Sequence, residues 1–75
     1  MKQKRMNILG ANHLAESWNR DHSVGIRVKY HHIIGEKEFT VHVTRSPASV
    51  LEGHTAVIFL EGISGCVALK AIEIL

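Results

Sequence analysis

Histidine and cysteine are the residue types in this chain that could do chemistry, and its 75 residues hold six His and one Cys. A structural zinc site needs four ligands in closely spaced pairs, whereas His42, His54 and Cys66 are scattered singly. His31 and His32 are adjacent on a predicted strand, so their side chains point to opposite faces and only one can join His42 across a hairpin. We therefore expect no metal site and no cofactor, but surface histidines and a small buried cysteine.

Nucleophilic catalysis is not indicated either. A reactive thiol needs an electropositive, accessible setting, and the sequence places no His–Asp or His–Asn pair near Cys66. Ser46 and Ser49 lie close to Arg45, but no general base accompanies them. We expect no catalytic residue and no enzyme activity.

Basic residues suggest contact with phosphate groups. Arg27 and Lys29 alternate along one predicted strand, and His42 is expected on the same solvent face of the next. The basic residues of the N-terminal arm, residues 1–9, could add further phosphate contacts, and the net charge is +2. Proteins that bind single-stranded nucleic acid usually add aromatic side chains on which bases stack. Trp18 is the one aromatic residue that is not assigned to the predicted core. Binding of DNA or RNA is therefore an alternative, not the first interpretation.

Binding of another protein is the class that we favour. Trp18 and the connection from Arg45 to Thr55 could form a surface for a peptide or an added strand. Within that connection, Arg45 and His54 either hold the chain by hydrogen bonds to buried carbonyls or are presented to a ligand. We favour the second reading, because long loops in compact domains are often where binding resides.

The length of the chain allows one small domain, expected over residues 10–75, with residues 1–9 as a mobile arm. A single cysteine excludes an intrachain disulfide and fits a reducing, cytoplasmic compartment. The longest apolar run, residues 56–60, is far shorter than the roughly 20 residues that a membrane helix needs. We expect no membrane association.

The first element predicted is a short helix over residues 12–21. Asn12 can cap its start, and Leu14, Ala15 and Trp18 form its apolar stripe. A helix of this length is not stable alone and must pack its tryptophan on the rest of the domain.

Alternation of apolar and polar residues next predicts two strands, 24–30 and 39–44, joined by a turn at residues 35–37. The same alternation predicts one core face and one solvent face for this hairpin. The core face is expected to hold Val28 and Tyr30 of the first strand and Phe39 and Val41 of the second. The solvent face is expected to hold Arg27, Lys29, Thr40, His42 and Thr44.

The second half predicts a helical turn at residues 48–51, a central strand at 55–61 and two final strands at 66–69 and 72–75. The apolar residues of the last two strands are out of phase, so a bulge or a 3₁₀ turn must fall at residues 70–71. Glycines that reverse the chain should adopt positive φ, and the candidates are Gly53, Gly62 and Gly65.

A strand, a one-turn 3₁₀ helix and a short final strand resemble the closing segment of SH3-type barrels. We expect a mainly β fold, a small SH3-like barrel of four to five antiparallel strands preceded by a short N-terminal helix. Its open edge strands would make a homodimer possible. The side chains expected to be nearly fully buried are Val28, Val41, Val57, Phe59, Leu69 and Ile72.

Two sequence blocks carry a further resemblance. The chain reads Trp18-Asn19 and His22-Ser23-Val24-Gly25, then Thr44-Arg45-Ser46-Pro47-Ala48, Gly53-His54-Thr55-Ala56-Val57, Ser64-Gly65 and Val67-Ala68-Leu69. This pattern resembles WNxxHPVG followed by TRSPAxxLxGHTAVVxVEGxSGxVAL, found in small uncharacterised proteins of phages, prophages and other mobile elements. The resemblance spans roughly residues 18–72 and departs from the pattern at Ser23, where Pro is usual. The resemblance implies a genomic context and no mechanism, so no functional residue is carried over to this chain. We expect a non-enzymatic accessory protein that binds a host or phage protein in the host cytoplasm.

Overall fold

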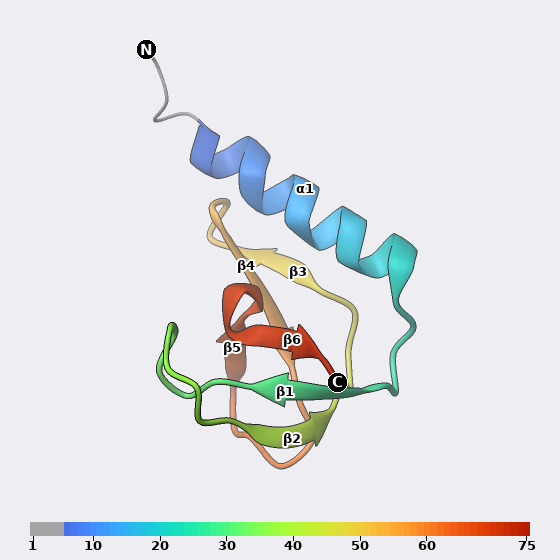
Figure 1. Cartoon of the computed structure of the whole chain (residues 1–75). Coiled ribbons are helices and arrows are strands. Elements are labelled where there is room, and N and C mark those ends of the chain that lie inside the picture. Colours follow the sequence, from blue (N-terminus) through green and yellow to red (C-terminus); the bar gives the residue numbers. More distant parts are fainter. Residues whose placement is uncertain (1–5) are drawn as a thin grey trace.

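Two small antiparallel sheets and one helix make up the fold of residues 6–75, which are the residues described by the computed structural model (Figure 1). The residues expected to form the basic arm, Lys2, Lys4 and Arg5, lie outside the described residues. The elements are α1 (Met6–Asp21), β1 (Arg27–Tyr30), β2 (Thr40–Val43), β3 (Ser49–Leu51), β4 (Thr55–Phe59), β5 (Cys66–Ala68), the 3₁₀ helix η1 (Leu69–Ala71) and β6 (Ile72–Ile74).

Each sheet has three strands, in the orders β2-β1-β6 and β3-β4-β5. An isolated antiparallel bridge between Thr44 and Leu60 joins the end of the first sheet to the end of the second. The expected mainly β class is confirmed. The two sheets do not close into a barrel within residues 6–75, so the expected SH3-like barrel is not confirmed. Strands of three to five residues offer too few ladder positions to extend one sheet into the other.

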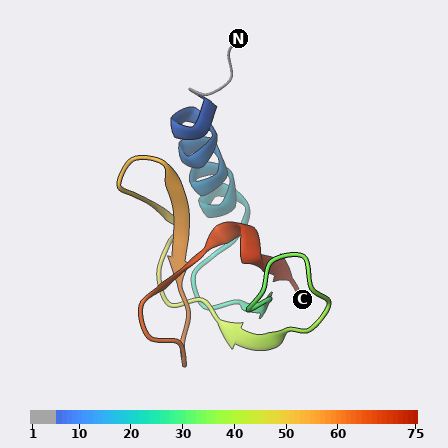
Figure 2. The ribbon, with the colours of Figure 1, turned by 90° about the vertical axis from the view of Figure 1, so that its left-hand side faces the viewer.

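The helix is longer than the sequence predicted, because it spans Met6–Asp21 instead of residues 12–21. Asn12 therefore lies inside the helix and not at its cap, and it is exposed. The buried side chains are Ala11 and Ala15, one turn apart, whereas Leu14 is 44% exposed. Two alanines leave little side-chain volume between the backbones, so α1 packs closely against β3 and β4 (Figures 1 and 2).

The first hairpin forms, but its strands are shorter than the predicted 24–30 and 39–44, and its register differs from the expected one. Lys29 lies opposite Val41, and Val28 lies opposite His42. Residues directly opposite each other share a face, so Arg27 and Lys29 lie on the face of Val41, and His42 lies on the other. The expectation that Arg27, Lys29 and His42 share one solvent face is therefore wrong. A register change of one residue exchanges the faces of a strand.

The core lies between the two sheets and the helix, and its fully buried apolar side chains are Val28, Ile58 and Leu60. Among the side chains predicted to be buried, those found buried are Val28, Val57, Leu69 and Ile72. Two predictions are wrong, since Val41 is 45% exposed and Phe59 is only half-buried. The register accounts for Val41, which lies beside Lys29 on the outer face of its sheet.

The second half confirms the predicted 3₁₀ turn, since η1 separates β5 from β6. Positive φ is likewise confirmed for Gly53, Gly62 and Gly65. Residues 48–51, expected to form a helical turn, instead contribute strand β3, which pairs with β4. Pairing with a long neighbouring strand satisfies more backbone groups than an isolated turn would, and this decides the conformation.

The side chain of Asn19 joins the helix to the start of β3. Its amide nitrogen donates to the carbonyl oxygen of Ala48 at 2.9 Å, and its Oδ1 accepts from the Ala48 amide at 2.8 Å. One side chain thus satisfies both polar groups of a residue whose own side chain is buried. This pair fixes the end of α1 against the second sheet.

We expect Asn19→Ala to lower the free energy of unfolding by about 1–3 kcal/mol, because both backbone groups of Ala48 lose their partner. The matched control is Asn12→Ala. Because Asn12 is exposed inside the helix, its replacement should raise stability by about 0.5 kcal/mol, as alanine has the higher helix propensity. Urea denaturation of the two variants measures both values. A destabilising Asn12→Ala and a neutral Asn19→Ala would contradict the helix assignment.

Candidate functional site

The sequence motif Thr44–Ala48 makes internal contacts throughout its length. Thr44, expected on the solvent face of the hairpin, is instead 1% exposed, because the chain has left β2 there and bridges to Leu60 at the end of the second sheet. Its Oγ1 accepts hydrogen bonds from the backbone amides of Gly25 at 2.9 Å and Ile26 at 3.3 Å. Its own amide donates to the Ile26 carbonyl, and its carbonyl accepts from the Gly25 amide. Thr44 therefore holds the segment that leads from the helix into β1.

Arg45 and Ser46 contact the residues at the end of β4. The Arg45 Nε donates to the carbonyl of Leu60 at 3.0 Å, and its guanidinium lies 5.1 Å from the centre of the Phe59 ring. The Ser46 hydroxyl donates to the Pro47 carbonyl and accepts from the Phe59 amide at 3.2 Å. These contacts match the first of the two readings of Arg45, in which it holds the chain by hydrogen bonds to carbonyls.

The side chain of His42 belongs to a hydrogen-bonded row along the hairpin. Its Nδ1 lies 3.0 Å from the Glu61 carbonyl, and its Nε2 lies 2.7 Å from the Thr40 hydroxyl. His32 reaches the same hydroxyl with its Nε2 at 2.9 Å. One of the two adjacent histidines thus meets His42, as the alternation of a strand requires, and the other points away.

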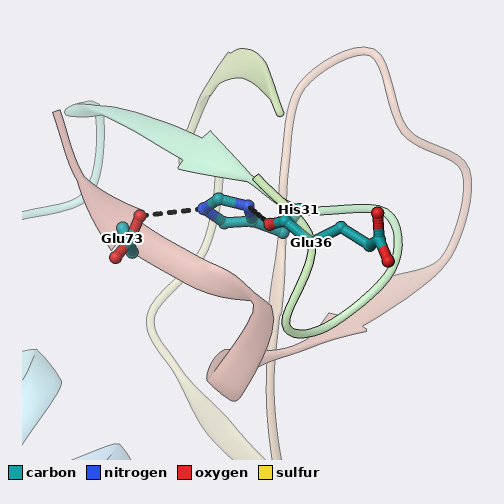
Figure 3. A network of polar contacts seen from close by, with 3 residues as sticks. All are labelled: His31, Glu36 and Glu73. Carbon is teal, nitrogen blue, oxygen red and sulfur yellow. Dashed lines mark hydrogen bonds and ion pairs between the residues drawn. The ribbon is translucent and has the colours of Figure 1, made fainter. Parts of the chain in front are cut away.

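The other of these two histidines, His31, contacts β6 (Figure 3). Its Nδ1 lies 2.9 Å from the Glu36 carbonyl, and its Nε2 lies 2.8 Å from a carboxylate oxygen of Glu73. Both oxygens accept hydrogen bonds, so the contact is complete only when both ring nitrogens carry a proton. The hydrogen bond to Glu73, with the Glu36 carbonyl adding to it, raises the pKa of His31 above 6.5.

Arg27 and Lys29 lie on the outer face of the first sheet. Lys29 is opposite Glu73 on one side and Val41 on the other. Its ammonium lies 4.8 Å from the centre of the ring of Phe39, which is 43% exposed. This face is thus mixed in charge and carries an exposed aromatic ring that the sequence placed in the core.

Two hollows lie along one side of α1, where the helix faces the chain from Ala68 to Ile72. The first has a volume of about 320 Å³. Its lining includes Gly10, Leu14, His54, Ala56, Ala68 and Lys70. The second, of about 290 Å³, includes Leu14, Trp18, Asp21, His22, Leu69 and Ile72. Because both share Leu14, we treat them as one surface and call it the helix groove.

Trp18 and His54, two of the residues singled out from the sequence, thus lie in the helix groove, one in each hollow. Trp18 is partly buried, and its ring lies 4.3 Å from that of His22. The other four selected residues, Arg27, Lys29, His42 and Arg45, do not line either hollow. Sequence reasoning missed the other groove residues, among them Leu14 and Lys70. Leu14 was placed in the buried stripe, and no pattern in the sequence relates Lys70 to the helix.

Within residues 6–75, no group of three or more His, Cys, Asp or Glu side chains could hold a metal ion. Cys66 is half-buried. No helix among the described residues is long and apolar enough to span a membrane.

Replacement of Arg45 by alanine should lower the free energy of unfolding by about 1–2 kcal/mol, because the Leu60 carbonyl loses a charged donor. Arg27→Ala is the control, as Arg27 is exposed and makes no side-chain hydrogen bond to a described residue. That change should stay within about 0.5 kcal/mol of the wild type. Thermal and urea denaturation provide the comparison, and equal stability of both variants would speak against a structural role for Arg45.

Stability should also depend on pH through His31. The folded-state pKa of His31 is raised above 6.5, so its contribution is fully present below pH 6.5 and is lost as the pH rises through the raised pKa. Glu73→Gln should bring the pKa of His31 back toward 6.5, measured by NMR titration of the ring protons. Glu61→Gln is the control, since Glu61 contacts a histidine only through its backbone carbonyl. A His31 pKa that Glu73→Gln leaves unchanged would refute this assignment.

Comparison with known proteins returned no match to a family model, to a curated protein or to a solved structure. The resemblance to a phage family consequently stays an interpretation of the motif residues alone. The function has to be argued from the geometry of the helix groove and of the surfaces around it.

Proposed function

We propose that the protein is a non-enzymatic binding module that holds a segment of another protein in the helix groove. The observation that carries this proposal is Leu14, an apolar side chain 44% exposed at the junction of two hollows. An exposed leucine alone needs no explanation. A leucine between two concave, largely apolar hollows forms the kind of surface that buries side chains of a ligand.

The dimensions of the groove suggest the form of its ligand. The hollows are centred about seven helical residues apart, from Ala11 in the first to Trp18 in the second, which corresponds to roughly 10 Å along a helix. Two apolar side chains of the partner at about that spacing would fill them. The partner segment therefore needs two apolar anchors. On a helix they would be about two turns apart, and on an extended chain about three residues apart.

The charged side chains at the two hollows suggest how the bound segment is oriented in the groove. Lys70 and His54 lie at the first hollow, whereas Asp21, whose carboxylate is 3.4 Å from the Arg20 guanidinium, lies at the second beside His22. Lys70 makes no ion pair with any residue in the range 6–75. A carboxylate of the partner near Lys70 would complement the charge of that ammonium group. We infer that the acidic end of the bound segment faces Lys70.

The motif resemblance supports a setting for this module. Phage and prophage accessory proteins act on host or phage proteins in the host cytoplasm, and we propose a partner of this kind. We also propose that the fold is related to SH3-like barrels. The 3₁₀ helix between β5 and β6, and the antiparallel pairing of β6 with β1, support that relation.

The test compares two substitutions of equally exposed apolar residues. Leu14→Gln removes the apolar contact in the groove and keeps a good helix former. Val41→Thr is the control, because Val41 is 45% exposed on the outer face of the first sheet and Leu14 is 44% exposed. We expect partner capture from nuclease-treated host lysate to fall at least about tenfold for Leu14→Gln, as a lost apolar anchor costs about 1.4 kcal/mol or more. Capture by Val41→Thr should match the wild type.

A second variant, Lys70→Glu, tests the direction of the ligand. It should weaken capture, and weaken it more at low salt than at high salt, because the charge contribution is screened. Capture that survives Leu14→Gln but is lost in Val41→Thr would move the site to the outer face of the first sheet and overturn the proposal.

Nucleic-acid binding is the alternative function, and one contact favours it. Lys29 lies over the ring of Phe39, which is 43% exposed, so the outer face offers a cation next to a ring on which a base could stack. Glu73 beside Lys29 opposes this reading. Binding to phosphates would lose affinity steeply with salt and would be lost in Phe39→Ala, whereas binding in the helix groove would not.

A further inference from the structure

Two imidazole nitrogens on the first hairpin point to one oxygen atom. The Nε2 of His42 lies 2.7 Å from the Thr40 hydroxyl oxygen, and the Nε2 of His32 lies 2.9 Å from it. Thr40 and His42 are two apart on β2 and therefore share a face of the strand. The two nitrogens thus approach a common point at the edge of the molecule.

The tautomer of His42 follows from its second partner. The Glu61 carbonyl lies 3.0 Å from Nδ1 and can only accept a hydrogen bond. The Nδ1 atom therefore carries the hydrogen in the neutral ring, and the lone pair of Nε2 faces the Thr40 hydroxyl. A histidine that binds a metal through one nitrogen commonly donates from its other nitrogen to a carbonyl, which orients the ring.

Both rings are also held by a neighbouring aromatic side chain. The Tyr30 ring centre lies 4.4 Å from that of His32 and 6.0 Å from that of His42. The Glu61 segment is fixed in turn, because its amide donates to the Val43 carbonyl at 2.8 Å. The two imidazoles are therefore oriented toward their common point before anything binds there.

We propose that His32 and His42 bind a divalent late transition-metal ion through their Nε2 atoms. The ion occupies the region between the two nitrogens once the Thr40 side chain rotates, and water completes its coordination. Imidazole suits Zn²⁺, Ni²⁺ and Cu²⁺. A pair of imidazoles with solvent ligands does not require the closely spaced ligand pairs of a structural zinc site, whose absence led the sequence to predict no metal. This proposal is independent of the helix groove.

The proposal is tested with Zn²⁺ alone, titrated into ¹⁵N-labelled full-length protein at neutral pH and followed by NMR of the histidine rings. The ring signals of His32 and His42 should shift together and saturate, and those of His54 should not move. Cu²⁺ should bind more tightly than Zn²⁺. Binding should weaken at acidic pH, because only a neutral imidazole is a metal ligand.

Variants locate the site. His32→Ala should lower the Zn²⁺ affinity about tenfold or more, and His54→Ala, a change at an exposed histidine outside the cluster, should leave it unchanged. Thr40→Val removes the hydroxyl at constant shape and should retain binding, since the threonine is not a ligand. His32 is exposed, so its replacement leaves the fold intact, which circular dichroism verifies. Unmoved His32 and His42 signals in a large excess of Zn²⁺, or equal loss in His54→Ala, would overturn the proposal.

Discussion

The buried hydroxyl of Thr44 is the contact on which the arrangement of the whole domain depends. Thr44 is nearly inaccessible to solvent and uses its amide, its carbonyl and its side chain on the segment at Gly25 and Ile26. It also forms the isolated bridge to Leu60 that joins the two sheets. A buried polar group without partners is costly, so the satisfied threonine selects one way for the sheets to meet.

The neighbours of Thr44 extend this junction to the candidate site. Arg45 and Ser46 hold the end of β4, and Asn19 holds Ala48 from the helix. The two walls of the helix groove are α1 and the chain that follows β5. Both walls pack on elements that are connected through contacts of the motif. Within the motif Thr44 and Ala48 are buried, and none of the residues 44–48 lines the groove.

Local signals in the sequence were sufficient to predict most of the helices and strands. They were insufficient to predict which residues of these elements contact one another. Alternation located the strands of the hairpin, and the phase change after Leu69 located η1. The faces of the hairpin were wrong, because alternation within each strand does not determine which residue lies opposite which. The helix began earlier than its apparent cap at Asn12, since packing of two alanines outweighs a local capping preference.

The candidate site was harder to predict for the same reason. Trp18 and His54 were selected, but the residues that complete the groove come from segments more than fifty positions apart, and no pattern relates Leu14 to Lys70. The pairing of His42 with one of two adjacent histidines could be foreseen from strand geometry. That it is His32, and that Thr40 lies between them, depends on the register.

The two hydrogen bonds between Asn19 and Ala48 have a consequence for recognition. They connect residues 29 positions apart and hold the C-terminal half of α1 in place against the second sheet. The helix cannot swing outward without breaking both, so one wall of the groove is rigid in the free protein. A ligand that enters a preorganised site loses little free energy to ordering its receptor, and even a short segment with two anchors can then bind with useful affinity.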